Sequence, residues 1–142
     1  MARGLKTLIR LARWAVDEKR RVLTALQTRE DEIVGAIADA ERQLAAEQEV
    51  AARDATGAGY LYGAFAESWL SRRAELEAAL AGVRAEIDVA RDVLAEAYRQ
   101  QKTYEITQAN RDRLAREEAD RKEQAFLDEV GLTTFRRRES GD

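Results

Sequence analysis

Apolar side chains recur along most of the chain at alternating steps of three and four residues, the spacing of a helix that buries one face against a partner. A strict 3.5-residue repeat requires such a partner, because a lone straight helix drifts about 20° per heptad away from it. We call the positions of this repeat the seam. The first run of seam positions comprises Leu5, Ile9, Ala12, Val16, Lys19, Leu23, Leu26, Glu30, Ile33, Ile37, Ala40, Leu44, Glu47 and Ala51. The second run comprises Tyr62, Ala66, Trp69, Arg73, Leu76, Leu80, Val83, Ile87, Ala90, Leu94 and Ala97. The pattern predicts two long helices that pair through these seams.

Between the two runs, Gly57, Gly59 and Gly63 fall within ten residues, and the chain contains no proline. Glycine adopts the positive-φ conformations that reverse a chain. The sequence therefore predicts an all-α fold, a single antiparallel two-helix coiled-coil domain over residues 1–142. We expect a helix over 4–53, a corner within 54–63, a second helix over 60–130 that ends at Gly131, and a tail over 131–142.

A fold-back centred near residue 58 sets the register between the two helices. It places Leu26 near residues 90–91 and brings the charged seam residues Glu47 and Arg73 to about equal distances from the corner. We therefore expect these two charges to pair. Gly35 and Gly82 fall opposite each other as well, which either permits close backbone approach or local bending, or is a coincidence.

Beyond Ala97 the seam positions become mostly polar, yet no glycine or proline interrupts the helix until Gly131. The first helix runs out of residues opposite about residue 112. We therefore expect residues 113–130 to project as a helical overhang. Its end carries exposed apolar side chains, followed by three consecutive arginines at 136–138.

Composition excludes several classes of function. The chain has no cysteine and no histidine, so thiolate chemistry, the commonest general base and the commonest metal ligand are missing. Clusters of carboxylates such as residues 30–32 are typical of solvated helix faces, and no EF-hand spacing is present. No apolar run approaches the roughly 20 residues of a membrane span. We expect a protein that is not an enzyme and that needs no cofactor or metal.

The net charge of −3 conceals an uneven distribution. Residues 1–29 hold eight basic and two acidic residues, whereas residues 30–59 hold two basic and eight acidic ones. The basic start over residues 1–16 holds four basic residues and no acidic one, and it is compatible with a presequence, with a helix on an anionic membrane or with phosphate binding. It already shares the 4-3 spacing of the seam, which favours the start of the coiled coil. The internal corner argues against a basic zipper, so no nucleic acid is expected.

Several segments punctuate this regular pattern with aromatic and basic residues. They are the run over residues 8–14, the run over 16–21, Trp69 with Arg72 and Arg73, the segment 97–105 and the closing segment 123–129. Taken together and in this order, they resemble the flagellar FliJ family over nearly the whole chain.

The resemblance implies an antiparallel coiled coil that forms the central stalk of the flagellar type III protein export apparatus, and through it a role in motility and chemotaxis. Its implied partners are the hexameric export ATPase, the membrane protein of the export gate and, in an escort role, export chaperones. Its implied place is cytoplasmic, peripheral at the cytoplasmic face of the inner-membrane export apparatus. An injectisome stalk is an alternative, as is a generic coiled-coil adaptor with a basic end that binds membrane or nucleic acid.

Three groups of residues are candidates for partner binding. At the start of the chain, Arg10, Arg13 and Trp14 lie off the seam, so we expect them to be idle in the free protein. Near the corner, Tyr60, Phe65 and Trp69 offer aromatic anchors. The resemblance places the gate contact around Trp69, although the seam register points that residue inward. The third group, Tyr98, Arg99 and Lys102, belongs to a segment that carries the resemblance.

Overall fold

The computed structural model describes the backbone of residues 2–53 and 58–141, and the side chains of residues 4–53 and 61–141. The described chain forms two helices, α1 (Ala2–Arg53) and α2 (Ala58–Ser140), and it contains no strand. The two long helices pack against each other, which confirms the predicted all-α fold. Of the predicted corner, residues 54–57 lie outside the described residues, and 58–63 form the first turns of α2.

The predicted end of the second helix is wrong, because α2 continues through Gly131 to Ser140. Gly131 does not adopt the left-handed backbone that a glycine cap requires, and an added Cβ there would meet no atom within 4 Å. The hydroxyl of Thr134 donates to the carbonyl of Val130 at 2.9 Å, as expected inside a helix. The helix ends where the Gly141 amide donates to the carbonyl of Arg137 at 2.9 Å. Residues 131–140 are therefore helical.

The chain divides into two compact units. The first unit combines residues 1–13 with 99–142, and the second unit spans Trp14–Tyr98. The sequence predicted one hairpin domain over the whole chain, and that organisation stays a prediction.

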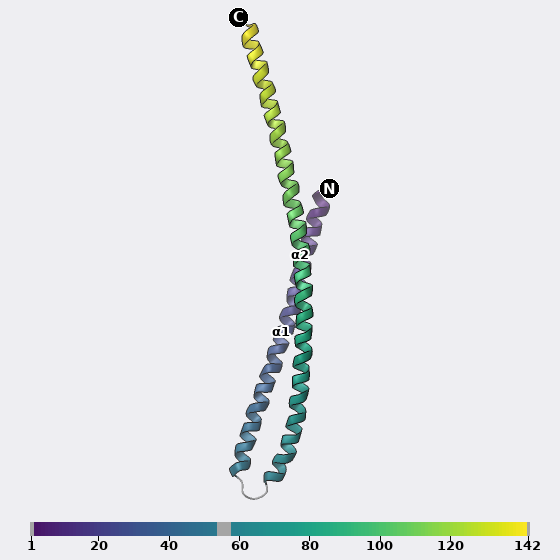
Figure 1. Ribbon diagram of the computed structural model, residues 1–142, viewed down its shortest axis with the longest axis vertical. Coiled ribbons are helices and arrows are strands. Elements are labelled where there is room, and N and C mark those ends of the chain that lie inside the picture. The colour runs from purple at the N-terminus through teal and green to yellow at the C-terminus, as the bar shows by residue number, and fades with distance from the viewer. Residues whose placement is uncertain (1, 54–57, 142) are drawn as a thin grey trace. The chain divides into compact units, whose positions relative to one another are not determined.

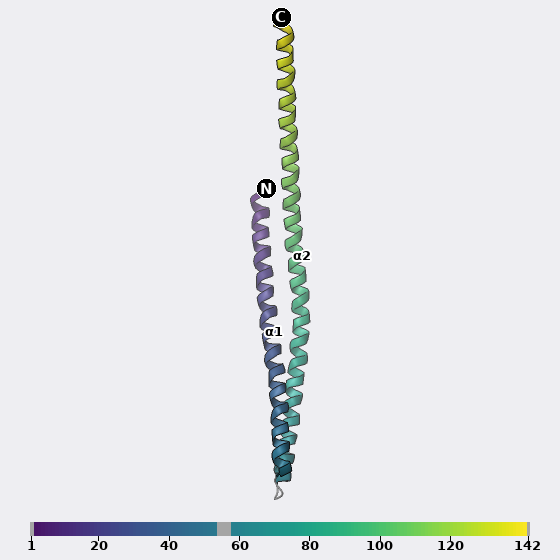
Figure 2. The ribbon, with the colours of Figure 1, turned by 90° about the vertical axis from the view of Figure 1, so that its left-hand side faces the viewer.

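Within the second unit, α1 and α2 lie side by side and run antiparallel (Figures 1 and 2). Glu30 of α1 pairs with Arg84 of α2, and Ala40 of α1 accepts a hydrogen bond from Trp69 of α2. The contacts thus move forward along α1 as they move backward along α2, which is the antiparallel direction. Leu26 and Ala90 line the same groove between the helices, in agreement with the register expected from the sequence.

The core follows the predicted seam without exception. Among the residues whose side chains the structure describes, ten hydrophobic ones are buried, and every one is a predicted seam position: Leu5, Ile9, Ala12, Val16, Ile33, Ala40, Trp69, Val83, Ile87 and Ala90. In the second unit Ile33, Val83 and Ile87 form the centre of a cluster against which half-buried leucines pack. Because a two-helix seam has no third layer to cover it, many flanking positions stay only half-buried.

The predicted pairing of Glu47 with Arg73 is wrong. Arg73 pairs with Glu41 at 2.9 Å and with Glu77 at 3.0 Å, while Glu47 is exposed and pairs with no described residue. The guanidinium also lies over the Trp69 ring, 5.5 Å from its centroid, where a cation is attracted to the aromatic face. At Gly35 and at Gly82 an added Cβ would meet nothing within 4 Å, so the backbones do not approach closely there.

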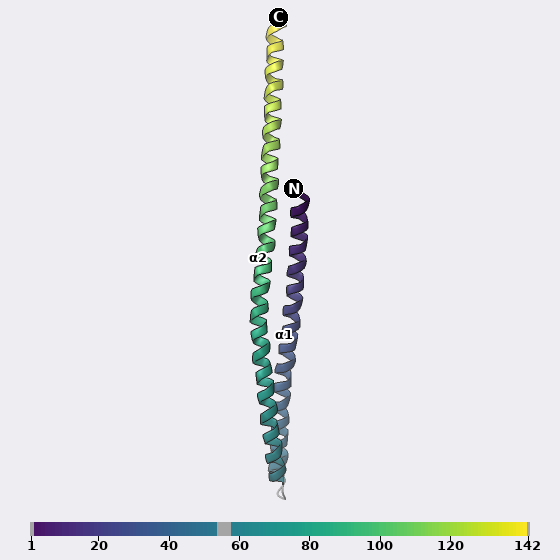
Figure 3. The ribbon, with the colours of Figure 1, turned by 90° about the vertical axis from the view of Figure 1, so that its right-hand side faces the viewer.

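In the first unit, the start of α1 lies beside the part of α2 that follows Arg99 (Figure 3). Leu5, Ile9 and Ala12 are buried there. On the α2 side the half-buried residues are largely polar, and the last of them is Gln108. All residues from 109 to 140 are exposed, as expected for an overhang, and this exposed stretch continues ten residues beyond the predicted end.

The substitution Ile87→Ala should lower the free energy of unfolding by about 2–4 kcal/mol, because it removes a large side chain that is only 3% exposed. Val34→Ala, at an exposed position, should cost less than about 0.5 kcal/mol. Urea unfolding followed by circular dichroism measures both values. Equal losses in the two variants would contradict the assignment of the core.

A double-mutant cycle tests the corrected partner of Arg73. Alanine substitutions at Arg73 and Glu41 should show a small favourable coupling energy, as partly exposed ion pairs do. The matched cycle between Arg73 and Glu47 should show none. A coupling confined to Glu47 would restore the original prediction.

Candidate partner-binding surfaces

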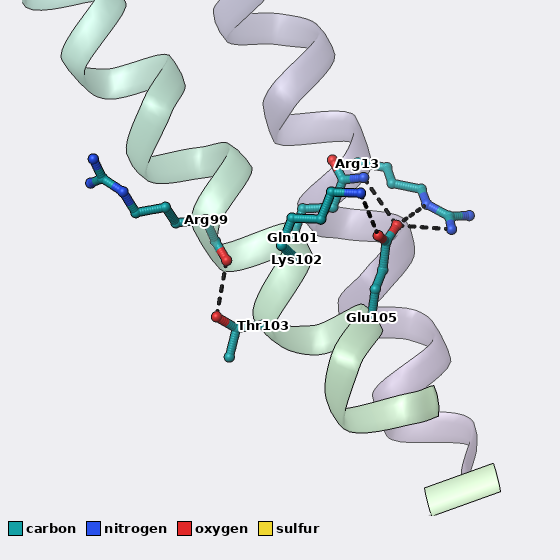
Figure 4. A network of polar contacts seen from close by, with 6 residues as sticks. All are labelled: Arg13, Arg99, Gln101, Lys102, Thr103 and Glu105. Atoms are coloured by element: carbon teal, nitrogen blue, oxygen red, sulfur yellow. Dashed lines mark hydrogen bonds and ion pairs between the residues drawn. The ribbon is translucent and has the colours of Figure 1, made fainter. Parts of the chain in front are cut away.

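A polar network in the first unit joins the two helices at Glu105 (Figure 4). Arg13 of α1 donates from Nε and Nη2 to the Oε1 atom of Glu105, with N···O distances of 3.2 and 3.0 Å. Gln101 donates to the same oxygen at 3.0 Å, and the ammonium of Lys102 lies 3.4 Å from Oε2. The Glu105 side chain is 24% exposed, so water solvates it only partly. The network lies beyond Ala97, in the part of α2 where the seam positions become mostly polar.

These donors stabilise the ionised form of Glu105. The hydrogen bond from Gln101, followed by that from Arg13, holds the pKa of the carboxyl below its usual value, against an opposing contribution from burial. A carboxyl whose pKa is lower in the folded state contributes stability above its ordinary pKa. That contribution is lost as the pH falls through the lowered value.

Arg13 is therefore not idle in the free protein, contrary to the expectation from its position off the seam. The contact with Glu105 occupies its guanidinium, although 62% of its side chain remains exposed. Sequence reasoning missed Glu105 as the acceptor, because the residue lies beyond Ala97, the last seam position of the second run. The sequence feature that could have indicated a polar contact here is the loss of apolar seam residues beyond Ala97. Polar side chains that are buried at a helix contact need hydrogen-bond partners.

Arg10 remains available to a partner. It is exposed, and among the described residues it makes no ion pair. Lys6, Arg10 and Arg13 follow one another at steps of four and three, so they share one face of α1, and together with Ile9 they line a small surface depression. We call Lys6, Arg10 and Arg13 the cationic face of the first unit.

Trp14, the third predicted residue of this group, belongs to the second unit, where 63% of its surface is exposed. A large exposed aromatic side chain of this kind is a frequent anchor in protein interfaces. The structure thus agrees with the exposure expected for Trp14.

Trp69 is unsuitable as an anchor in the free protein, because it is buried in the seam with 8% of its surface exposed. Its indole N–H donates to the carbonyl of Ala40 at 2.6 Å, and Arg73 covers its ring. The hydrogen bond to Glu77 comes first among the interactions that raise the pKa of Arg73, Glu41 adds to it, and burial opposes it. The Trp69 ring therefore holds the two helices together.

The remaining candidates occupy different settings. The side chain of Tyr60 lies outside the described residues, and Phe65 is half-buried. Leu61 and Leu70, which the sequence reasoning did not select, are 72% and 61% exposed. In the third group, 44% of Tyr98 is exposed in the second unit, and Arg99 and Lys102 are exposed in the first.

The described residues 2–53 and 58–141 contain no group of three acidic, histidine or cysteine side chains placed to hold a metal ion. Neither helix has, within the part that the structure describes, a stretch long and apolar enough to cross a membrane. The features that stand out are helix–helix contacts and exposed charged or apolar faces, which define the class of helical coiled-coil proteins.

The family model described as "Flagellar FliJ protein" matches residues 1–140, almost the whole chain, so this chain belongs to the FliJ family. This confirms the resemblance identified from the sequence. The family is a non-catalytic component of the flagellar protein export apparatus. Comparisons with curated proteins and with solved structures find no match.

The pKa of Glu105 predicts how the stability of the coiled coil depends on pH. As the pH falls from 7 to about 3, the parent protein should lose more stability than Glu105→Gln, because only the parent has a carboxylate to protonate at this position. Arg13→Ala should show a pH dependence between the two. Thermal melting by circular dichroism at several pH values measures the difference, and parallel curves for all three proteins would contradict it.

Proposed function

We propose that this chain is the stalk of a flagellar type III export apparatus and that its first unit inserts into the hexameric export ATPase. The family assignment makes it an export component, and the exposed end of α2 supports the particular role. In this role the chain supplies contact surfaces and mechanical coupling, while the ATPase supplies the chemistry.

The observation that carries the proposal is the exposed helix over residues 113–140. Its last part presents five large apolar side chains to solvent within ten residues, each between 45% and 67% exposed: Phe126, Leu127, Val130, Leu132 and Phe135. Exposed apolar residues scattered singly are normal on soluble proteins, but a dense group marks an interaction site. The central opening of a ring would cover this helix from several sides.

The cationic face adds an electrostatic contribution at the start of α1. Lys6 and Arg10 are exposed, and Arg13 retains more than half of its surface after contacting Glu105. Such a face favours a partner that presents carboxylates, and it steers the encounter. We infer that acidic side chains of the ATPase meet this face.

For the export gate, we propose contacts through exposed residues close to Trp69 in the sequence. Leu61 and Leu70 each leave more than half of their surface accessible, whereas the Trp69 ring is committed to the seam. We further propose a chaperone-escort role and action at the cytoplasmic face of the inner membrane, both of which rest on the family assignment.

The proposal predicts separate effects on binding and on folding. Substituting Lys6 and Arg10 together by alanine should leave the free energy of unfolding within about 0.5 kcal/mol of the parent, because both are exposed and neither pairs with a described residue. The same variant should bind a cognate export ATPase about tenfold more weakly and stimulate it less. Melting curves, an affinity titration and ATPase assays measure these quantities.

Two further variants make the experiment specific. Alanine at Arg72 and Arg91 removes the same charge from exposed positions of the second unit and should leave binding unchanged. The variant Trp14→Ala tests whether the exposed indole contributes to ATPase binding, as the sequence suggested. If the variant of Lys6 and Arg10 stimulates the ATPase as well as the parent does, the cationic face has no docking role, and a generic adaptor becomes the better interpretation.

A further inference from the structure

The second unit carries an apolar groove beside the seam. It has a volume of about 580 Å³ and is lined mainly by small and branched apolar side chains, namely Val22, Leu26, Ala85, Val89, Ala90 and Val93, with Lys19 and Glu86. Leu26 and Ala90 belong to the seam, but the valines do not. Val22, Val89 and Val93 are 52%, 63% and 41% exposed, so much of the groove faces water.

The two charged residues lie at opposite ends of this groove. Arg84 pairs with Glu30 across the seam, which places Glu86, two residues further along α2, close to the level of residue 28 on α1. Lys19 is therefore about nine residues, or roughly 14 Å, from that level along the helix axis. By the same register the valines fall between these two levels. The groove thus has a cation at one end, apolar side chains in the middle and an anion at the other end.

Neither charge is satisfied within the described part of the chain. Lys19 and Glu86 are both exposed, and neither forms an ion pair with a described residue. Arg20 and Arg21, the basic neighbours of Lys19, pair instead with Asp17 and Glu18 on their own helix. A partner on this groove would therefore meet two charges that are free to pair with it.

We propose that the groove is a self-association surface on which a second copy of this chain packs antiparallel, with Lys19 of each copy facing Glu86 of the other. A two-fold axis through the middle of the groove exchanges its two ends, so a surface with opposite charges at those ends is complementary to itself. The valines of the two copies then pack against one another. The result is a four-helix arrangement held by one apolar layer and two identical ion pairs.

This inference goes beyond the proposed export role and does not rest on it. The groove belongs to the second unit, whereas the cationic face and the exposed helix belong to the first. Self-association and ATPase binding can therefore succeed or fail separately.

Charge reversal tests the proposed geometry. In Lys19→Glu each copy would meet Glu86 with a second carboxylate, and in Glu86→Lys each Lys19 would meet a second ammonium. Each single variant should self-associate about tenfold more weakly than the parent, because two attractive pairs become two repulsive ones. Sedimentation equilibrium of the full chain over a range of concentrations measures the association constant.

Mixing the two single variants is the decisive step. In a mixed pair, the copy with Lys19→Glu would present carboxylates at both ends of its groove, and the copy with Glu86→Lys would present ammonium groups at both ends. Both contacts therefore become attractive again. The mixture should associate about as well as the parent, and so should the variant that carries both substitutions. Arg72→Glu and Glu67→Lys provide matched controls, since they change the charge by comparable amounts at exposed positions outside the groove.

Val89→Asp tests the apolar middle of the groove independently of its ends. It should abolish self-association while circular dichroism shows an unchanged helix content, because Val89 is 63% exposed and lies off the seam. A parent protein that stays monomeric at all concentrations would overturn the proposal. A helix of another protein would then be the better candidate for binding to the groove. A mixture that associates no better than its components would overturn it as well.

Discussion

Burial of apolar side chains along one seam is the constraint on which both units depend. All ten buried hydrophobic residues lie on it, and no other described residue reaches their degree of burial. A two-helix seam offers no second core, so its loss would leave neither helix with a fixed neighbour. The position of every surface residue, from Arg10 to Val89, is set by its angle from the seam. The seam therefore determines which side chains a partner can reach.

Periodicity was sufficient to predict this seam because burial in a coiled coil depends only on position in the repeat. From this periodicity we predicted two α-helices, their antiparallel register and the burial of Trp69 in the seam. The end of α2 was not predictable in the same way. Gly131 costs helix propensity but does not forbid a helix, and the residues around it form one regardless. A glycine becomes a helix end only where the backbone adopts the left-handed conformation.

Polar contacts were harder to predict than apolar ones. A long side chain such as Arg73 can reach several turns of the facing helix, so equal distance from a corner does not select its partner. Arg73 lies over the Trp69 ring and pairs with Glu41, and both contacts depend on three-dimensional packing. The same reach connects Arg13 to Glu105 from outside the seam. Among the partner-binding candidates, exposure at Trp14 followed from periodicity, whereas the engagement of Arg13 did not.

The exposed end of α2 is held by interactions of a different physical kind from those of the seam. Its support comes from side chains one turn apart, such as Arg113 with Glu117 at 3.7 Å, Lys122 with Glu118 at 3.5 Å, and Gln124 with Asp128 at 3.0 Å. Dissolved ions screen exposed charge pairs, whereas excluded salts such as sulfate strengthen apolar burial. Raising the concentration of sulfate therefore loosens this end of the helix while it tightens the seam. Ionic strength therefore acts in opposite directions on the part of α2 that packs against α1 and on the part that is exposed.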